Sequence, residues 1–269
     1  MSAVSAALGI AVLAAAGLAL ALWRRTAEVA RLRAQLQSAS GQLERLQQSF
    51  SRFAPEEVVE RVIASGATTE GERKQVTALF ADLVGYTALS DSLDASLLVG
   101  ILNGYFERMS RAITGHRGHV STFIGDGILA FFGAVGSNPW QVDDAVHAAL
   151  AMREELADYN RELRKDGLPE LEIGIGLHRG TGVAGLVGSR DRMEYAFVGR
   201  TVNVAARVQD LTRQHPVDIL LTRPVQKELD RRFVLRELPA AELRGISEPV
   251  DIFAVEHFQA TPSAAPDSP

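Results

Sequence analysis

Residues 119–132 read HVSTFIGDGILAFF. Two apolar runs, 119–123 and 127–132, flank the tripeptide Gly125-Asp126-Gly127, and a glycine-rich turn between two such runs is typical of a β-hairpin. The stretch therefore predicts two antiparallel strands with an acidic residue at the turn between them. What lies on either side of this hairpin decides the fold class.

The segments that flank the hairpin show helical and strand patterns. Apolar residues recur every three or four positions over 93–113, and Asn138-Pro139 predicts an N-cap followed by proline at the first position of a helix that runs to about residue 163. The runs 76–83 (VTALFADL) and 171–177 (LEIGIGL) are short and apolar, which indicates buried strands. The order strand, helix, strand, strand, helix, strand predicts an α+β fold, the split βαβ arrangement of a ferredoxin-like sandwich.

These elements belong to a predicted globular domain over residues 74–257. The same domain is predicted to hold a strand near 182–187, a helix from about Thr201, and short strands near 218–221 and 249–255. Residues before and after this domain have a different composition.

The overall composition is that of a folded protein. Of the 269 residues, 46% are hydrophobic and 23% are charged, which excludes a wholly disordered chain and a protein that crosses a membrane many times. The absence of cysteine excludes disulfides, thiol nucleophiles and cysteine-based zinc sites. The formal net charge of −5 gives no basic surplus, so we expect no nucleic-acid partner.

The first 23 residues carry no charged side chain, and Arg24 and Arg25 follow at once. As a helix, the run from Ala3 to Trp23 would span roughly 30 Å, which is about the thickness of a bilayer core. A cleaved signal peptide is the alternative, but it would carry its basic residues before the apolar run. We therefore predict a single-pass anchor over 1–23 in the cell (inner or plasma) membrane, with the rest of the chain in the cytoplasm.

Residues 24–54 show a heptad pattern. Apolar residues alternate at spacings of three and four, at Val29, Leu32, Leu36, Ala39, Leu43, Leu46, Phe50 and Phe53. We predict a parallel coiled-coil stalk, with a single amphipathic helix lying on the next domain as the alternative. Residues 55–73 are predicted to form a short helix and a hinge, and the tail 258–269, rich in Pro, Ala and Ser, is predicted to be disordered.

Two carboxylates stand out in the predicted domain. Asp82 ends the first strand, in FADLVGYT, and Asp126 lies at the tip of the hairpin. In a split βαβ fold the first strand lies beside the hairpin, so the two side chains are candidates to converge, and paired carboxylates suit Mg²⁺. The alternative is that both residues are ordinary turn formers.

Two further groups are candidates for contacts with a phosphorylated ligand. The junction after the first strand consists of Val84, Gly85, Tyr86 and Thr87. Its backbone N–H groups lie where a strand meets a helix and can hold a phosphate there, with an ordinary strand-to-helix turn as the alternative. Asn203 and Arg207 share one helix face, where an amide and a guanidinium can orient a sugar and neutralise a phosphate. A solvated helix face is the alternative for this pair.

Four motifs together resemble those of the class III nucleotide cyclase catalytic domain. They are FADLVGYTALS (80–90), FIGDGILAFFG (123–133), GIGLHRGTGVAGLVGSRDRMEY (174–195) and VGRTVNVAARV (198–208). Their order and spacing are similar to those of that family over about 74–255, roughly two-thirds of the chain. The resemblance implies an enzyme that converts ATP into 3′,5′-cyclic AMP and pyrophosphate.

The resemblance also implies roles for residues. Asp82 and Asp126, with the backbone of Leu83, would hold two Mg²⁺ or Mn²⁺ ions per site, and these ions would activate the ribose 3′-hydroxyl and hold the triphosphate. Asn203 and Arg207 would orient the ribose and stabilise the transition state.

The resemblance extends to Arg244 and to the assembly. Arg244, in LRGISEPV, falls near a basic residue that the family uses on the triphosphate. The family builds its site across a head-to-tail dimer, with the metal ions held by one chain and the Asn203 and Arg207 pair supplied by the other. A homodimer with two sites is therefore expected, and the predicted stalk independently suggests one.

Two positions depart from the family pattern. Adenylate cyclases usually have Lys where this chain has Thr122, and Asp or Thr where it has Ala196, and neither residue matches the Glu and Cys typical of guanylate cyclases. We keep ATP as the predicted substrate because the guanine-reading Glu is missing. The alternatives are a guanylate cyclase, or a catalytically weak cyclase-like module of relaxed specificity that binds nucleotide and relays a membrane signal.

Overall fold

The computed structural model describes residues 71–134, 137–189 and 193–260, together with six isolated residues between 28 and 41, all of them helical. The predicted anchor 1–23 and the apolar seam of the predicted stalk lie outside the described residues, so both stay predictions. Among the described residues, no helix is long and apolar enough to cross a membrane.

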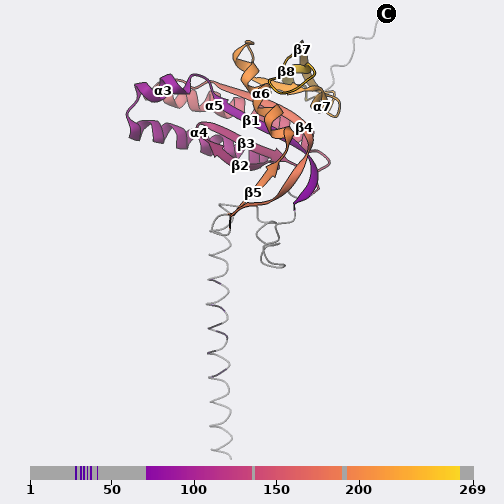
Figure 1. The fold of residues 1–269 in the computed structure, drawn as a ribbon. Helices are drawn as coiled ribbons and strands as arrows, with labels where there is room; N and C mark the ends of the chain where they lie inside the picture. Colours follow the sequence, from indigo (N-terminus) through magenta and orange to yellow (C-terminus); the bar gives the residue numbers. More distant parts are fainter. Residues whose placement is uncertain are drawn as a thin grey trace, which may run out of the picture. The chain divides into compact units, whose positions relative to one another are not determined.

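The folded part of the chain alternates strands and helices (Figure 1). In order, the elements are β1 (Glu72–Leu83), α3 (Tyr86–Ser92), α4 (Ala95–Gly115), β2 (His119–Ile124), β3 (Gly127–Phe132), α5 (Gln141–Lys165), β4 (Ile173–Gly188), β5 (Met193–Val198), α6 (Arg200–Asp210), the 3₁₀ helix η1 (Leu211–Arg213), β6 (Ile219–Thr222), α7 (Arg223–Gln226), β7 (Phe233–Ala241) and β8 (Val250–Phe258).

The strands form one mixed sheet in the order β2-β3-β1-β4-β6-β8-β7, and β5 pairs with the distal half of β4. In the block β2-β3-β1-β4 every neighbouring pair is antiparallel, while β4 and β6 are parallel. With α4 connecting β1 to β2 and α5 connecting β3 to β4, this block is the predicted split βαβ unit. The predicted ferredoxin-like α+β fold is confirmed.

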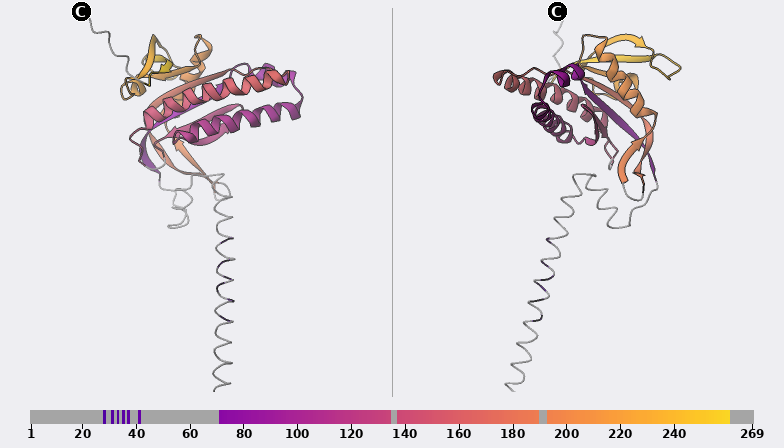
Figure 2. Two further views of the ribbon diagram at one scale, coloured as in Figure 1. Left: turned by 180° about the vertical axis from the view of Figure 1, so that it is seen from behind. Right: turned by 60° about the vertical axis from the view of Figure 1, so that its left-hand side comes forward.

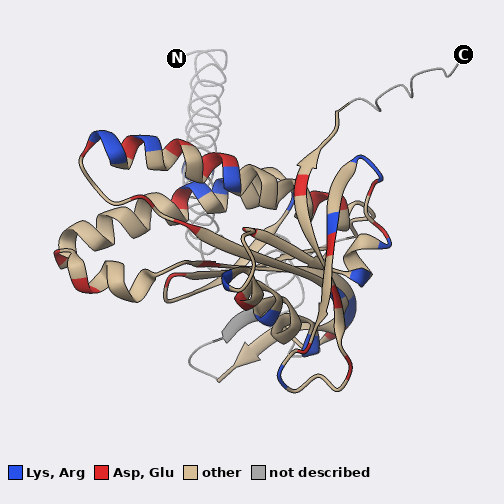
Figure 3. Ribbon diagram, turned by 90° about the horizontal axis from the view of Figure 1, so that it is seen from above, with Lys and Arg blue, Asp and Glu red and all other residues tan. Residues whose placement is uncertain are grey.

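Helices cover both faces of the sheet. On one face α4 and α5 run side by side (Figure 2). Their apolar sides pack on alternate strand residues such as Leu79, Ala81 and Phe132, which are fully buried. On the other face α6 packs against β4 and β1. Charged residues gather mostly on the helices and hairpin ends, and the middle of the sheet carries few of them (Figure 3).

The close approach of α6 to β4 depends on glycine. Gly174, Gly176 and Gly180 occupy alternate positions of β4, so all three face α6 and η1, while Ile175 and Leu177 between them face the main core. A Cβ at Gly176 would fall on the backbone nitrogen of Gln209 and the backbone oxygen of Ala205. The alternation of glycine with isoleucine in IGIGL therefore sets the distance between helix and sheet.

The start of α5 differs from the prediction. The helix begins at Gln141, and Trp140 rather than Asn138 is its N-cap, so Pro139 lies before the helix. Asn138 still organises this end, because its Oδ1 accepts from the Trp140 amide at 3.0 Å and its Nδ2 donates to Asp144 at 2.8 Å. The Asn-Pro pair thus forms a turn that leads into the helix.

The predicted strand boundaries need three corrections. The segments 171–177 and 182–187 were expected as separate strands, but β4 is one strand of 16 residues, because β1 pairs with residues 173–184 and β5 pairs with residues 183–188. β1 begins at Glu72, two residues before the predicted start of the domain and inside the predicted hinge. β8 extends to Phe258, the first residue of the predicted disordered tail, and most of that tail lies outside the described residues.

Two strands, β5 and β7, were not predicted. The segment FVLRELPAA of β7 contains Pro239, which argues against a central strand. Proline is tolerated in β7 because this strand lies at the edge of the sheet, where one row of backbone N–H groups needs no partner strand.

We expect Gly176→Ala to lower the free energy of unfolding by about 2 kcal/mol or more, because the new methyl group would push α6 off the sheet. Gly100→Ala is the matched control, since a Cβ at Gly100 of α4 meets nothing within 4 Å. The control should be neutral or slightly stabilising, because alanine favours a helix over glycine. Urea denaturation of the two variants checks this, and equal midpoints would contradict the proposed role of Gly176.

Candidate active site

The two predicted acidic residues meet at one end of the sheet. Asp82 is the penultimate residue of β1, and Asp126 lies in the turn between β2 and β3. Antiparallel pairing of Ala81 with Ile128 brings this turn to the end of β1. The Leu83 amide then donates a hydrogen bond of 3.2 Å to Oδ2 of Asp126. The structure therefore brings together the three residues Asp82, Leu83 and Asp126.

Glycines flank Asp82 on both neighbouring strands. Asp82 pairs with Gly174 of β4, and on the β3 side a Cβ at Gly127 would lie 3.4 Å from Oδ1 of Asp82. Because neither neighbour carries a side chain, neither neighbouring strand places a side chain against the Asp82 carboxylate. Two carboxylates with such glycine neighbours suit a hard cation that also binds oxygen atoms of a ligand.

Arg213, which the sequence analysis did not single out, reaches the same carboxylate. It lies in η1 directly after α6, and its Nη2 donates to Oδ2 of Asp82 at 2.7 Å. Burial raises the pKa of Asp82 to about 7, and the neighbouring Asp126 carboxylate adds to the rise while Arg213 opposes it. Nothing in the motif LTRQHP distinguishes this arginine from a solvated one, because the contact depends on where α6 ends over β1.

Asn203 and Arg207 lie on α6, away from the two acids. Asn203 is exposed and Arg207 is half-buried. Neither of them forms a hydrogen bond or ion pair with Asp82 or Asp126 in the described part of the chain. Arg207 lies instead against the loop between β7 and β8, close to Gly245 and therefore to its chain neighbour Arg244. The structure thus divides these predicted residues into two groups. The acidic group is Asp82, Leu83 and Asp126, and the basic group is Arg207 and Arg244 together with the amide of Asn203.

Residues 69–257 match the family described as the adenylate and guanylate cyclase catalytic domain. The chain belongs to this family. An adenylate cyclase of Anabaena cylindrica is 33% identical over 234 residues, which are 83% of this chain and 46% of that protein. Adenylate cyclase 1 of Rhizobium meliloti is 32% identical over 209 residues, which are 77% of this chain and 31% of that protein. The chain therefore spans less than half the length of these two relatives.

Solved structures give the same family. The guanylyl cyclase Cya2 superposes with a TM-score of 0.65 at 32% identity, over 72% of this chain and 97% of that one. The adenylyl cyclase CyaB of P. aeruginosa superposes with a TM-score of 0.67 at 29% identity, over 71% of this chain and 98% of that one. A guanylyl cyclase and an adenylyl cyclase thus both share this fold.

The two positions that depart from the family pattern lie on β2 and β5, two strands that are not paired in the sheet. Thr122 is on β2, after a register shift that follows Val120, and its hydroxyl donates to the backbone oxygen of Phe123 at 3.3 Å. Ala196 is on β5, opposite Gly185 of β4. Strands β2 and β5 contact each other, so the fold places these two positions in one region of the domain.

The junction after β1 forms the expected strand-to-helix turn. Gly85 has a φ of 72°, in the left-handed region, and is the N-cap of the short helix α3, which Tyr86 and Thr87 open. The Val84 amide donates to the backbone oxygen of Glu172 at 2.8 Å, so this donor is already used within the domain. A phosphate contact at this junction stays a prediction.

Tyr105 of α4 is a second residue that sequence reasoning missed. Its side chain is fully buried, and its hydroxyl has no hydrogen-bond partner among the described residues. Burial raises the pKa of this phenol, and the carboxylates of Asp82 and Asp126 raise it further. The hydroxyl therefore stays protonated.

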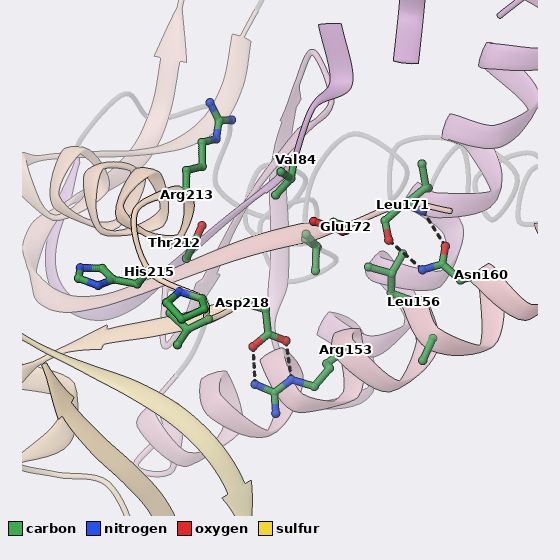
Figure 4. Close-up of a pocket in the computed structure, with 14 residues that line it drawn as sticks. Val84, Arg153, Leu156, Asn160, Leu171, Glu172, Thr212, Arg213, His215 and Asp218 are labelled. Atoms are coloured by element: carbon green, nitrogen blue, oxygen red, sulfur yellow. Dashed lines mark hydrogen bonds and ion pairs between the residues drawn. The ribbon is translucent and has the colours of Figure 1, made fainter. Parts of the chain in front are cut away.

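A cavity of about 610 Å³ lies between α5, the start of β4 and the loop that leads to β6, and Arg213 is one of the residues that line it (Figure 4). Its wall includes a double hydrogen bond between Arg153 and Asp218 at 2.6 and 2.7 Å. Asn160 closes another side by bonding both the amide and the carbonyl oxygen of Leu171 at 2.8 Å. Of the residues predicted for the site, Val84 alone lines this cavity.

We expect Asp82 to contribute a loss of stability to the chelator-treated protein as the pH rises from about 4 to about 7. The folded protein holds the Asp82 proton up to about pH 7, whereas an unfolded aspartate loses it near pH 3.9, so raising the pH favours unfolding in this window. Asp82→Asn should lose less stability over the window than wild type.

Thermal unfolding between pH 4 and pH 8 measures this slope. Asp91→Asn is the matched control, because Asp91 is an exposed acid on α3 and its replacement should leave the wild-type slope unchanged. Parallel curves for wild type and Asp82→Asn would show that the Asp82 proton is not held in the folded state.

Proposed function

We propose that this chain is an adenylate cyclase that converts ATP into 3′,5′-cyclic AMP and pyrophosphate. The observation that carries the proposal is the meeting of Asp82 and Asp126 at the end of β1, in a domain whose relatives include proteins named adenylate cyclase. The four motif residues Asp82, Asp126, Asn203 and Arg207 are all present, which supports catalysis over a purely structural role.

The acidic group fits divalent cations. Asp82 and Asp126 supply hard oxygen ligands, and the glycines beside Asp82 leave its carboxylate uncovered by neighbouring strands. We propose that these residues, with the backbone of Leu83, hold two Mg²⁺ or Mn²⁺ ions. When bound, the ions would supply Lewis-acid activation of the 3′-hydroxyl and charge neutralisation of the triphosphate.

The basic group would act on the sugar and the phosphates. Asn203 is exposed on α6 and is free to hydrogen-bond a ribose oxygen. Arg207, four residues further on, would stabilise the charge that develops on the α-phosphate, a role worth on the order of 10³-fold in comparable phosphoryl-transfer sites. Arg244 in the adjacent loop would contact the triphosphate.

The separation of the two groups supports a shared site. Within one chain Asn203 and Arg207 do not contact the acids, so we propose a head-to-tail homodimer in which the acids of one chain face the Asn203 and Arg207 pair of the other. Two sites per dimer follow. A coiled-coil stalk over 24–54 and a membrane anchor over 1–23, with the catalytic domain in the cytoplasm, are proposed from the sequence alone.

The purine preference rests on Thr122 and Ala196. Thr122 has a hydroxyl that can donate to or accept from a purine edge, whereas Ala196 has no polar side-chain atom. Losing one buried base contact costs about 1–3 kcal/mol, which would relax the choice between ATP and GTP without removing the phosphate chemistry. The similarity to the guanylyl cyclase Cya2 makes GTP the second candidate substrate.

We expect the purified full-length chain to form cyclic AMP from ATP with Mg²⁺ or Mn²⁺, at a higher kcat/KM than it forms cyclic GMP from GTP. Asp82→Ala should abolish both products, because it removes one of the two carboxylates proposed to bind the metal ions. Chromatography of the products with each nucleotide and metal measures this. A folded wild-type dimer that releases no cyclic nucleotide under any of the four conditions would exclude catalysis and leave a nucleotide-binding module.

We expect two inactive variants to restore activity when they are co-expressed. Asp126→Ala removes one of the two acids of its chain, and Arg207→Ala removes the guanidinium on α6 of its chain. A heterodimer of the two variants therefore keeps one intact site. With random pairing the mixture should regain about one quarter of wild-type activity. Heterodimers isolated with two affinity tags but without activity would rule out a shared site.

A further inference from the structure

A tight turn between β7 and β8 lies directly against Arg207. It spans Leu243 to Ile246, and the Ile246 amide donates to the Leu243 carbonyl oxygen at 2.9 Å, which closes a β-turn. Gly245, the third residue of this turn, has a φ of 74°. A positive φ at the third position is characteristic of a turn that favours glycine there.

The turn is fixed to α6 by apolar packing. Leu243 is buried, with 4% of its surface exposed, in a cluster that includes Val204 and Val208 of α6. Ile246 packs against the same cluster from the other end of the turn. The turn and the helix that carries Arg207 therefore share one packed unit, and a change in one displaces the other.

Gly245 is the point of contact with the guanidinium. A Cβ built on Gly245 would lie 3.3 Å from Nη1 and 3.8 Å from Nη2 of Arg207. Contacts at 3.3 Å are tighter than van der Waals distance, so any side chain here would move the guanidinium by a few tenths of an ångström. Arg207 has no hydrogen bond or ion pair with any described residue, so packing alone sets its position.

We propose that Gly245 is a positioning residue for Arg207. By lacking a Cβ, it lets the turn lie close enough to fix the guanidinium on α6 at the place from which it acts across the dimer. The proposal rests on the function proposed above, in which Arg207 stabilises the transition state. It assigns to the β7–β8 loop a second role beside the triphosphate contact of Arg244, namely setting the geometry of the partner's site.

We expect Gly245→Ala to lower kcat for ATP by about 10-fold or more while KM changes by less than about 3-fold, because a small misplacement of a transition-state group costs rate rather than substrate binding. Gly167→Ala is the matched control. Gly167 has a φ of 71°, close to that of Gly245, but a Cβ there meets nothing within 4 Å. The control carries similar backbone strain and should keep wild-type kcat.

A second variant separates strain from contact. Asparagine tolerates a positive φ better than alanine, so Gly245→Asn relieves the backbone strain but still places a Cβ beside Arg207. We expect Gly245→Asn to show a defect in kcat as large as that of Gly245→Ala. Recovery of wild-type kcat by asparagine would mean that backbone strain causes the defect, which overturns the proposal.

Complementation assigns the defect to one half of the site. Co-expression of Gly245→Ala with Asp126→Ala should restore activity, because the heterodimer has one site with intact acids and an undisturbed Arg207. Co-expression of Gly245→Ala with Arg207→Ala should not restore activity beyond that of Gly245→Ala itself, because both changes damage the same half. Restoration by Arg207→Ala would overturn the proposal.

A readout that needs no turnover distinguishes failure of this proposal from failure of the proposed function. In protein labelled with ¹⁵N-arginine, the Nε–H resonance of Arg207 is identified by its loss in Arg207→Lys. This resonance should shift in Gly245→Ala and stay in place in Gly167→Ala. An unshifted resonance overturns the positioning role. A shifted resonance in a protein without cyclase activity would retain the contact and reject the proposed function.

Discussion

The antiparallel pairing of β1 with both of its neighbours is the constraint on which the site depends. Ala81 pairs with Ile128 on one side, and Asp82 pairs with Gly174 on the other. Because side chains alternate along a strand, this register sends Leu83 into the main core and Asp82 to the face that α6 covers. A slip of one residue would bury the carboxylate among apolar side chains and expose the leucine.

The second constraint is the column of glycines on β4. With no side chains at Gly174, Gly176 and Gly180, the backbone of α6 comes into direct contact with the strand. That distance decides where η1 ends, and so whether Arg213 reaches Asp82. The same helix carries Arg207, so the positions of Arg207 and of the ion pair at Asp82 both depend on glycines that have no side chain.

The sequence was sufficient for features that depend on local pattern. The hairpin around Asp126, the helices over 93–113 and from Thr201, and the split βαβ order all follow from periodicity and turn chemistry, and the structure confirms them. Features that depend on distant partners were missed. Two separate strands were predicted where the structure has β4, which pairing with β1 and β5 keeps extended over 16 residues. Arg213 and Tyr105 carry no motif, and only the packing of α6 and α4 places them beside the acids.

Electrostatics bears on the proposal that the site is shared between two chains. The Asp126 carboxylate lies close enough to oppose ionisation of Asp82, and among the described residues Arg213 pairs with Asp82 and offsets this effect. Arg207 lies instead against the turn at Gly245. Under the proposed function, a substrate with its cations would meet the acids of one chain and the guanidinium of another. Catalysis would then depend on the relative orientation of the two catalytic domains. The predicted stalk would fix this orientation, and it would therefore control the rate without contacting the substrate.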